Sequence, residues 1–195
     1  MGDHVLFFYG TLMAPQILHR VIHGQANPEP WQKAMLRFQP AILQGYRRHR
    51  VQNADYPGIV AVPETETESD LSAPKTSAET SVVGTLVSGL TDGDIHRLDR
   101  FEGSEYEKKR VTVRTLAAVV GGDHGNASEG AAENQLREML NATTGAEVAA
   151  EGEEVSAMTY VYTAGEDMLE DSEWDFESFK RDKMAWWVQA DESEW

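Results

Sequence analysis

Hydrophobic residues gather without alternation near the start of the chain, where residues 5–8 are Val-Leu-Phe-Phe. A short run of this kind, rich in aromatic side chains, favours a β-strand that is buried on both faces. Gly10 ends the run, and apolar residues four positions apart over residues 13–24 then predict a helix. Pro15 suits its first turn and Gly24 its C-terminal cap.

The rest of the pattern predicts short strands over residues 41–51, 81–88, 108–116 and 158–163. A short helix is expected over residues 91–98, and a C-terminal helix is expected to begin at Ser172. Strands and helices do not alternate regularly. This order favours an α+β domain with a closed mixed sheet and helices at its rim.

The C-terminal helix carries an aromatic side made of Phe176, Phe179, Trp186 and Trp187. At helical spacing such a stripe is typical of packing against a core, and we expect that role here.

Two stretches, at about residues 64–80 and 121–154, are rich in Glu, Ala, Gly, Ser and Thr and poor in apolar residues. Such segments bury too little apolar surface to order themselves. The sequence therefore predicts one domain over residues 1–195, interrupted by two low-complexity inserts.

Composition narrows the choice of partners. The chain has 33 acidic and 17 basic residues, a net charge of -16, which disfavours binding to nucleic acids and to anionic membranes. It has no cysteine, which excludes disulfides and thiolate nucleophiles. We find no apolar stretch long enough to span a membrane and no signal peptide, and we expect a cytoplasmic protein.

The loop that follows the first strand is a candidate binding site. The backbone N–H groups of Gly10, Thr11 and Leu12 lie between a buried strand and a helix, where they can converge on an anion or a developing oxyanion. The simpler interpretation is a hydrophobic strand that ends in a glycine turn. The residues alone leave both interpretations open.

The same loop, Tyr9-Gly10-Thr11-Leu12, resembles the characteristic loop of the gamma-glutamylcyclotransferase-like superfamily. Three more motifs resemble that family and occur in its order. They are Tyr56-Pro57-Gly58-Ile59, then Leu98-Asp99-x-Phe101-Glu102 followed by Tyr106, and finally the helix start Trp174-Asp175-Phe176. The ordered set is similar to the avirulence-induced-gene-like branch of plants and fungi.

The resemblance implies a fold and an activity. The fold is a small mixed β-barrel with flanking helices. The activity is that of a gamma-glutamylcyclotransferase, which cyclises a small gamma-glutamyl amide and releases 5-oxoproline and an amine or amino acid. Glu102 is the expected catalytic residue, since one carboxylate can take the proton from the α-amine and return it to the leaving amine. Neither a metal nor an organic cofactor is expected, and the oligomeric state stays open.

The resemblance also implies which residues bind the substrate: Tyr9, Gly10, Thr11, Leu12, Tyr56, Pro57, Gly58, Tyr106 and Tyr162. Because Glu102 follows an aromatic residue, we expect it to be partly buried, with a raised pKa.

Two alternatives compete with this function. The same fold can serve as a non-catalytic small-molecule-binding or regulatory module, because fold does not determine function. Asp99 and Glu102, or Glu102 and Glu105, can also form the acid and nucleophile of a glycosidase, but a three-residue spacing in a turn does not fix the separation of the carboxyls.

Two basic features stay open in the same way. The arginines at positions 47, 48 and 50 fit a solvated strand face or contact of one of them with a substrate carboxylate. Lys108 stands where the family often has arginine, which matters only if its side chain pairs with a carboxylate.

Overall fold

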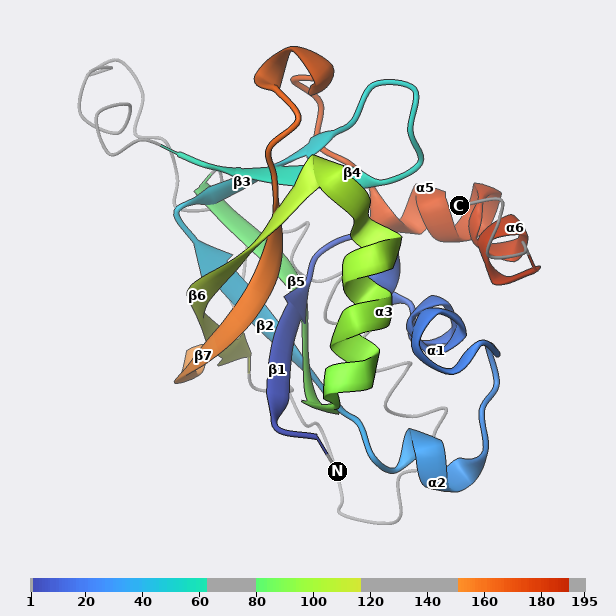
Figure 1. Ribbon diagram of the computed structural model, residues 1–195. Coiled ribbons are helices and arrows are strands. Elements are labelled where there is room, and N and C mark those ends of the chain that lie inside the picture. Colours follow the sequence, from blue (N-terminus) through green and yellow to red (C-terminus); the bar gives the residue numbers. More distant parts are fainter. Residues whose placement is uncertain (1, 63–79, 117–150, 190–195) are drawn as a thin grey trace, which may run out of the picture.

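A computed structural model describes residues 2–62, 80–116 and 151–189, and its elements are labelled in Figure 1. The strands are β1 (His4–Phe8), β2 (Arg37–Gln44), β3 (Tyr46–Arg50), β4 (Pro57–Ala61), β5 (Ser81–Leu90), β6 (Tyr106–Leu116) and β7 (Glu151–Tyr162). The α-helices are α1 (Pro15–His23), α2 (Pro30–Lys33), α3 (Asp92–Glu102), α5 (Phe176–Asp182) and α6 (Met184–Gln189). Short 3-10 helices are η1 (Thr11–Met13), η4 (Gly103–Glu105) and η5 (Glu166–Met168).

Five strands form a closed barrel in the order β1-β5-β2-β6-β7. Its antiparallel ladders are completed by a parallel contact between β1 and β7, where Leu6 pairs with Met158. Strands β3 and β4 form a separate two-stranded sheet. Figure 1 shows α3 against the barrel, α1 beside α3, and α5 and α6 on the same side. The predicted α+β fold, a small mixed barrel with flanking helices, is confirmed.

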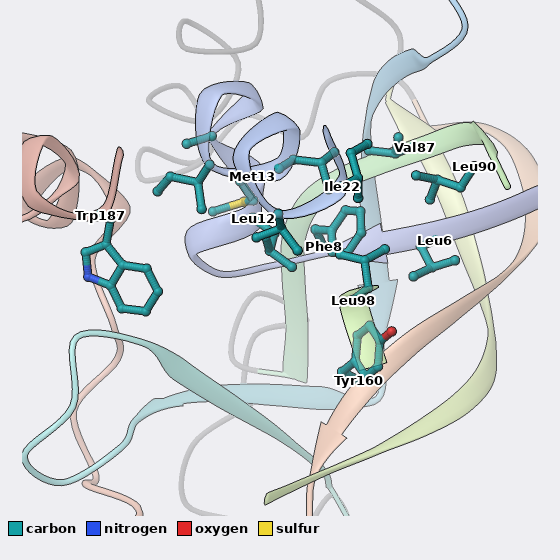
Figure 2. Close-up of a cluster of buried hydrophobic side chains, with 14 of the residues drawn as sticks. Leu6, Phe8, Leu12, Met13, Ile22, Val87, Leu90, Leu98, Tyr160 and Trp187 are labelled. Atoms are coloured by element: carbon teal, nitrogen blue, oxygen red, sulfur yellow. The ribbon is translucent and has the colours of Figure 1, made fainter. Parts of the chain in front are cut away.

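Strand β1 is buried on both faces, as its unbroken apolar run predicts. Leu6 and Phe8 belong to the hydrophobic cluster shared by the barrel and the helices, which Figure 2 shows in close-up. Phe7 and Tyr9 point the other way and pack with residues of the barrel strands in a second cluster. Period-two alternation therefore sends successive β1 side chains to two different cores.

Helix α1 covers the outer face of β1. It begins at Pro15 and is capped by Gly24, whose φ of 72° is left-handed and whose N–H donates to Arg20 O at 2.9 Å. Ile17, Leu18 and Ile22 are fully buried against the barrel. Each such side chain stabilises the fold by about 1.5–3 kcal/mol through the area it removes from water.

Two elements in the first two thirds of the chain differ from the sequence prediction. The strand expected over residues 41–51 is divided at Gly45, whose φ of 78° turns the chain between β2 and β3. The short helix that Thr91 caps continues to Glu102 rather than ending at Leu98. The continuation places Glu102 on the last turn of a helix instead of in an irregular stretch.

The C-terminal part shows three more differences. Strand β7 begins at Glu151, so residues 151–154 of the second expected insert lie in the barrel, paired with β6. Asp175 rather than Ser172 caps α5, because its carboxylate accepts the Glu177 N–H at 3.0 Å. The expected single helix is two, since Lys183 leaves helical geometry between α5 and α6.

The remainder of both expected inserts, residues 64–79 and 121–150, lies outside the described residues. None of the helices in the described ranges has the length and apolar composition needed to cross a membrane.

Two histidines stack on helix α1. The rings of His19 and His23 are 5.5 Å apart between centroids, with an angle of 18° between their planes. His19 is buried, and within the described residues its Nδ1 has no hydrogen-bond partner. Burial, His23 and Lys33 together lower the pKa of His19 from 6.5 to about 4. Between about pH 6.5 and 4, His19 is therefore neutral in the folded protein and protonated in the unfolded chain.

We expect His19→Leu to reduce the acid sensitivity of the protein. As pH falls from about 6.5 to 4, the unfolded chain takes up the proton first, so native stability is lost over that window and is fully present above it. Thermal denaturation from pH 7.5 to 4 should show a shallower fall of Tm for His19→Leu than for the native protein. His96→Leu, at an exposed position on α3, serves as the control. Parallel Tm curves for all three proteins would contradict the prediction.

Candidate active site

A pocket of about 320 Å³ opens where strand β1 ends. Five parts of the chain form its walls: residues 7–12, the turn at Tyr56 and Pro57, residues 101–106, Tyr160 on β7, and Trp187 on α6. The barrel, the end of α3, the turn between β3 and β4, and helix α6 thus all contribute to one cavity.

Glu102 is the last residue of α3 and lies half-buried in the pocket wall. The helix ends there because Gly103 takes a φ of 69° and donates its N–H to Asp99 O. Burial, together with the negative charge of Asp99, raises the pKa of Glu102 from 4.5 to about 8. No group in the described residues donates a hydrogen bond to the Glu102 carboxyl to offset that cost. The carboxyl is therefore poised to gain or lose a proton near neutral pH.

Asp99, one turn earlier on α3, is held in the opposite state. Burial by itself raises the pKa of Asp99, but hydrogen bonds from Lys108 and Tyr160 outweigh it and keep that pKa below its ordinary value. Lys108 Nζ donates to both Asp99 oxygens at 2.9 Å, and the Tyr160 hydroxyl donates to Oδ1 at 2.7 Å. Lys108 thus pairs with a carboxylate. The environments push the pKa values of Asp99 and Glu102 apart, as in sites that need one charged and one protonatable carboxyl.

Three tyrosines of the pocket have their hydroxyl protons committed to the protein. The Tyr9 hydroxyl donates to Tyr160 O at 2.6 Å, and the Tyr106 hydroxyl donates to Pro57 O at 2.8 Å. The Tyr56 hydroxyl donates to Glu105 Oε2 at 3.0 Å. Burial is the largest cause that raises the pKa of all three, in Tyr56 to about 12. They stay protonated near neutral pH, and the Tyr9 oxygen also accepts a hydrogen bond from the Ile59 backbone, so the oxygens of Tyr56 and Tyr106 are the candidate acceptors for a ligand.

The loop after β1 presents backbone donors. Gly10 is extended, with φ -126° and ψ -140°, and its carbonyl accepts the Met13 N–H that opens η1. Within the described residues, the N–H groups of Gly10, Thr11 and Leu12 have no acceptor. A Cβ on Gly10 would lie 2.8 Å from Pro57 Cδ, so only glycine allows the loop and the Tyr56–Pro57 turn to approach this closely.

The structure brings together most of the residues that the sequence placed at the site. Those that line the pocket are Tyr9, Gly10, Thr11, Leu12, Tyr56, Pro57, Glu102 and Tyr106. Gly58 and Tyr162, which the resemblance places at the site, are not among the residues that line it. They pack against each other instead, because a Cβ on Gly58 would lie 2.7 Å from Tyr162 Cβ. The Tyr162 hydroxyl is buried without a partner among the described residues.

Sequence reasoning missed several residues of the pocket wall. Tyr160 lies two residues before Tyr162 on β7, and strand periodicity puts both on one face, so this signal was available. Helical spacing predicts core packing alone for Trp187. It is buried against Phe101 and Phe179 and also lines the pocket, a double role that helical spacing does not reveal.

The arginine cluster fits neither of its two interpretations as a whole. Arg47 and Arg50 are exposed on β3. Arg48 turns inward, but it contacts protein groups rather than the pocket: Tyr9 O at 3.0 Å, Val83 O at 3.3 Å and Glu173 Oε1 at 2.9 Å.

The chemistry that this geometry supports is proton transfer next to a set of hydrogen-bond donors. Glu102 can exchange a proton near neutral pH, and the loop N–H groups can bind a negative oxygen. In the described part of the chain, no three His, Asp or Glu side chains gather as they do around a metal ion.

Comparison with known proteins identifies the family of the chain. The family described as "Gamma-glutamyl cyclotransferase, AIG2-like" matches residues 6–131. The chain belongs to this family. The matched region contains the AIG2-like loop at residues 9–12, Glu102 and Tyr106, and the resemblance inferred from the motifs is confirmed.

Relatives from Arabidopsis thaliana cover nearly the whole chain. "Protein AIG2 C" is 25% identical over 178 residues, which are 91% of this chain and 73% of the relative. "AIG2-like protein C" is 24% identical over 185 residues, or 95% and 74% of the two chains. A solution structure of an Arabidopsis thaliana protein is 24% identical, with a TM-score of 0.49, and the match covers 91% of this chain and 80% of that one.

The electrostatic coupling of the two carboxyls makes a direct prediction. Asp99→Asn removes the fixed negative charge beside Glu102, so the pKa of Glu102 should fall below about 8, the value to which burial and the Asp99 charge together raise it. The measurement is a pH titration of side-chain carboxyl carbons by NMR, with the Glu102 signal assigned through Glu102→Gln. Asp92→Asn, at an exposed position in the first turn of the same helix, should leave the Glu102 titration unchanged. An unchanged midpoint in Asp99→Asn would show that Asp99 does not act on Glu102.

Proposed function

We propose that this protein is a gamma-glutamyl cyclotransferase that acts on a small gamma-glutamyl amide by intramolecular aminolysis. The products are 5-oxoproline and a free amine or amino acid. The observation that carries the proposal is Glu102, a carboxyl with its pKa raised to about 8, facing a cavity beside unpaired backbone donors. Membership of the gamma-glutamyl cyclotransferase, AIG2-like family supports the same class of reaction.

The reaction needs one proton carrier. The Glu102 carboxylate takes a proton from the α-ammonium of the substrate, and the freed amine attacks the γ-carbonyl carbon. The new C–N bond closes a five-membered ring, and the carbonyl oxygen becomes an oxyanion. When the oxyanion collapses, the bond to the leaving nitrogen breaks. Protons move through Glu102 from the attacking nitrogen to the leaving nitrogen, so the carboxyl ends each cycle as it began. A pKa near the working pH suits both transfers.

The surrounding groups bind and orient the substrate. The N–H groups at residues 10–12 are placed to stabilise the oxyanion, a contribution worth about 10²–10³ in rate per donor in comparable sites. Tyrosine oxygens in the wall accept hydrogen bonds from the substrate ammonium. Walls on several sides favour a folded-back substrate, whose amine lies close to its own carbonyl.

Replacement of Glu102 tests the proposal. Glu102→Gln keeps the size of the side chain but cannot accept a proton. We expect kcat for 5-oxoproline release to fall by roughly 10²–10⁴, with KM within a few-fold of native, because only the proton-transfer step is removed. The native rate should rise with pH and level off above about 8, and the variant should lose that rise.

The control is Glu107→Gln, which makes the same chemical change at an exposed position on β6. Its kcat should equal the native value. Equal turnover by Glu102→Gln and native protein would remove Glu102 from the mechanism. Absence of turnover by native protein across a panel of gamma-glutamyl amides would favour the non-catalytic binding module.

Gly10 offers a second test, of the loop. Gly10→Val places a branched side chain where a Cβ alone would lie 2.8 Å from Pro57 Cδ, so the loop and the Tyr56–Pro57 turn must separate. We expect turnover to be abolished while the protein stays folded, and Gly10→Ala to give an intermediate loss. Gly93→Ala, on α3 where a Cβ meets nothing closer than 3.7 Å, should keep native turnover. Native kcat/KM in Gly10→Val would exclude the loop from catalysis.

A further inference from the structure

We propose that Arg48 is a positioning residue that fixes the direction of the Gly10 N–H donor. The inference rests on the proposed function of the same pocket and adds a residue to it. Arg48 belongs to β3, in a sheet separate from the barrel, and is not among the residues of the pocket wall.

The guanidinium of Arg48 is held by groups on several parts of the chain. Its Nη1 donates to Tyr9 O at 3.0 Å and to Val83 O at 3.3 Å, and its Nη2 donates to Glu173 Oε1 at 2.9 Å. The side chain is 13% exposed, and the guanidinium lies 5.8 Å from the centre of the Trp174 ring. A planar fork with fixed donors is thus clamped between the end of β1, β5 and the segment before α5.

The bond to Tyr9 O determines more than the position of a carbonyl. Tyr9 C=O and Gly10 N–H belong to one rigid peptide plane, in which the two groups point in opposite directions. Arg48 draws the carbonyl to its own side, so the Gly10 N–H is directed away from Arg48. The donor is left without an acceptor among the described residues, and Gly10 lines the pocket.

The charge of Arg48 strengthens the effect. Arginine stays protonated at all physiological pH values, and a charged donor polarises the peptide whose carbonyl it binds. The Gly10 N–H then becomes a stronger donor to a developing oxyanion. Lysine cannot reproduce this arrangement, because a single ammonium has no planar fork to span Tyr9 O, Val83 O and Glu173 together.

The ion pair with Glu173 is the less important part of the arrangement. Glu173 has 69% of its side chain exposed, and exposed ion pairs contribute little to stability. Removing Glu173 leaves Arg48 with both of its backbone acceptors. The two partners can therefore be separated by experiment.

The experiment compares Arg48→Met, Arg48→Lys and Glu173→Gln with native protein. In the ligand-free state, the Gly10 amide resonance in a ¹H–¹⁵N NMR spectrum should move in Arg48→Met and stay in place in Glu173→Gln. In the assay, Arg48→Met should lower kcat for 5-oxoproline release by roughly 10–10²-fold with a small change in KM, since a misdirected oxyanion donor acts on the transition state. Arg48→Lys should lie between Arg48→Met and native protein. Arg47→Met, at the exposed neighbouring position, is the matched control and should behave as native.

Chemical rescue distinguishes positioning from general stability. Ethylguanidinium added to Arg48→Ala should restore part of kcat and return the Gly10 resonance toward its native position, and it should not affect Arg47→Ala. Should Arg48→Met fail to fold, Arg48→Lys supplies both readouts. A native Gly10 resonance, or native kcat, in a folded Arg48 variant overturns the inference.

The outcomes also separate this inference from the proposed function. If native protein releases no 5-oxoproline, the proposed function fails and the Gly10 resonance alone decides. A resonance that moves in Arg48→Met then supports Arg48 as the residue that orients the loop, and one that stays in place overturns it.

Discussion

Strand β1 must be buried on both faces, and the rest of the structure depends on that requirement. It closes the barrel between β5 and β7, so one set of its side chains fills the barrel core. It also supports the helices, so the alternate set packs under α1 and α3. A strand fixed from both sides cannot slide or tilt. This burial helps to fix the loop at its end, where Gly10 lies so close to Pro57 that a Cβ would come within 2.8 Å of Pro57 Cδ.

The carboxyl at the end of α3 is maintained at the expense of local stability. Glu102 is half-buried, next to a charged Asp99, without a hydrogen bond from the described residues. An arrangement designed for stability alone would avoid it, because an unpaired buried carboxyl disfavours ionisation. Lys108 and Tyr160 do not relieve the repulsion between the two carboxylates, since their hydrogen bonds stabilise the charged form of Asp99. Local rules of stability fail here, as they do at functional sites.

The sequence reveals the parts of the site that short patterns control. The β1 run, the glycine after it and the α1 caps are all properties of neighbouring residues, and the structure agrees with each. Errors arise where distant segments meet. Tyr162 has a hydroxyl suited to a pocket, yet its side chain packs closely against Gly58, in space that a side chain at position 58 would need. The inward turn of Arg48 depends on acceptors at Tyr9, Val83 and Glu173, which no local pattern places together.

Helix α6 supplies one residue of the pocket wall, Trp187. Trp187 lies beyond residue 131, where the family match ends, whereas the loop and Glu102 lie inside it. Part of the pocket wall is thus supplied by a residue outside the stretch that matches the family model. A substitution at Trp187 can therefore change the shape of the cavity while the loop and Glu102 keep their positions.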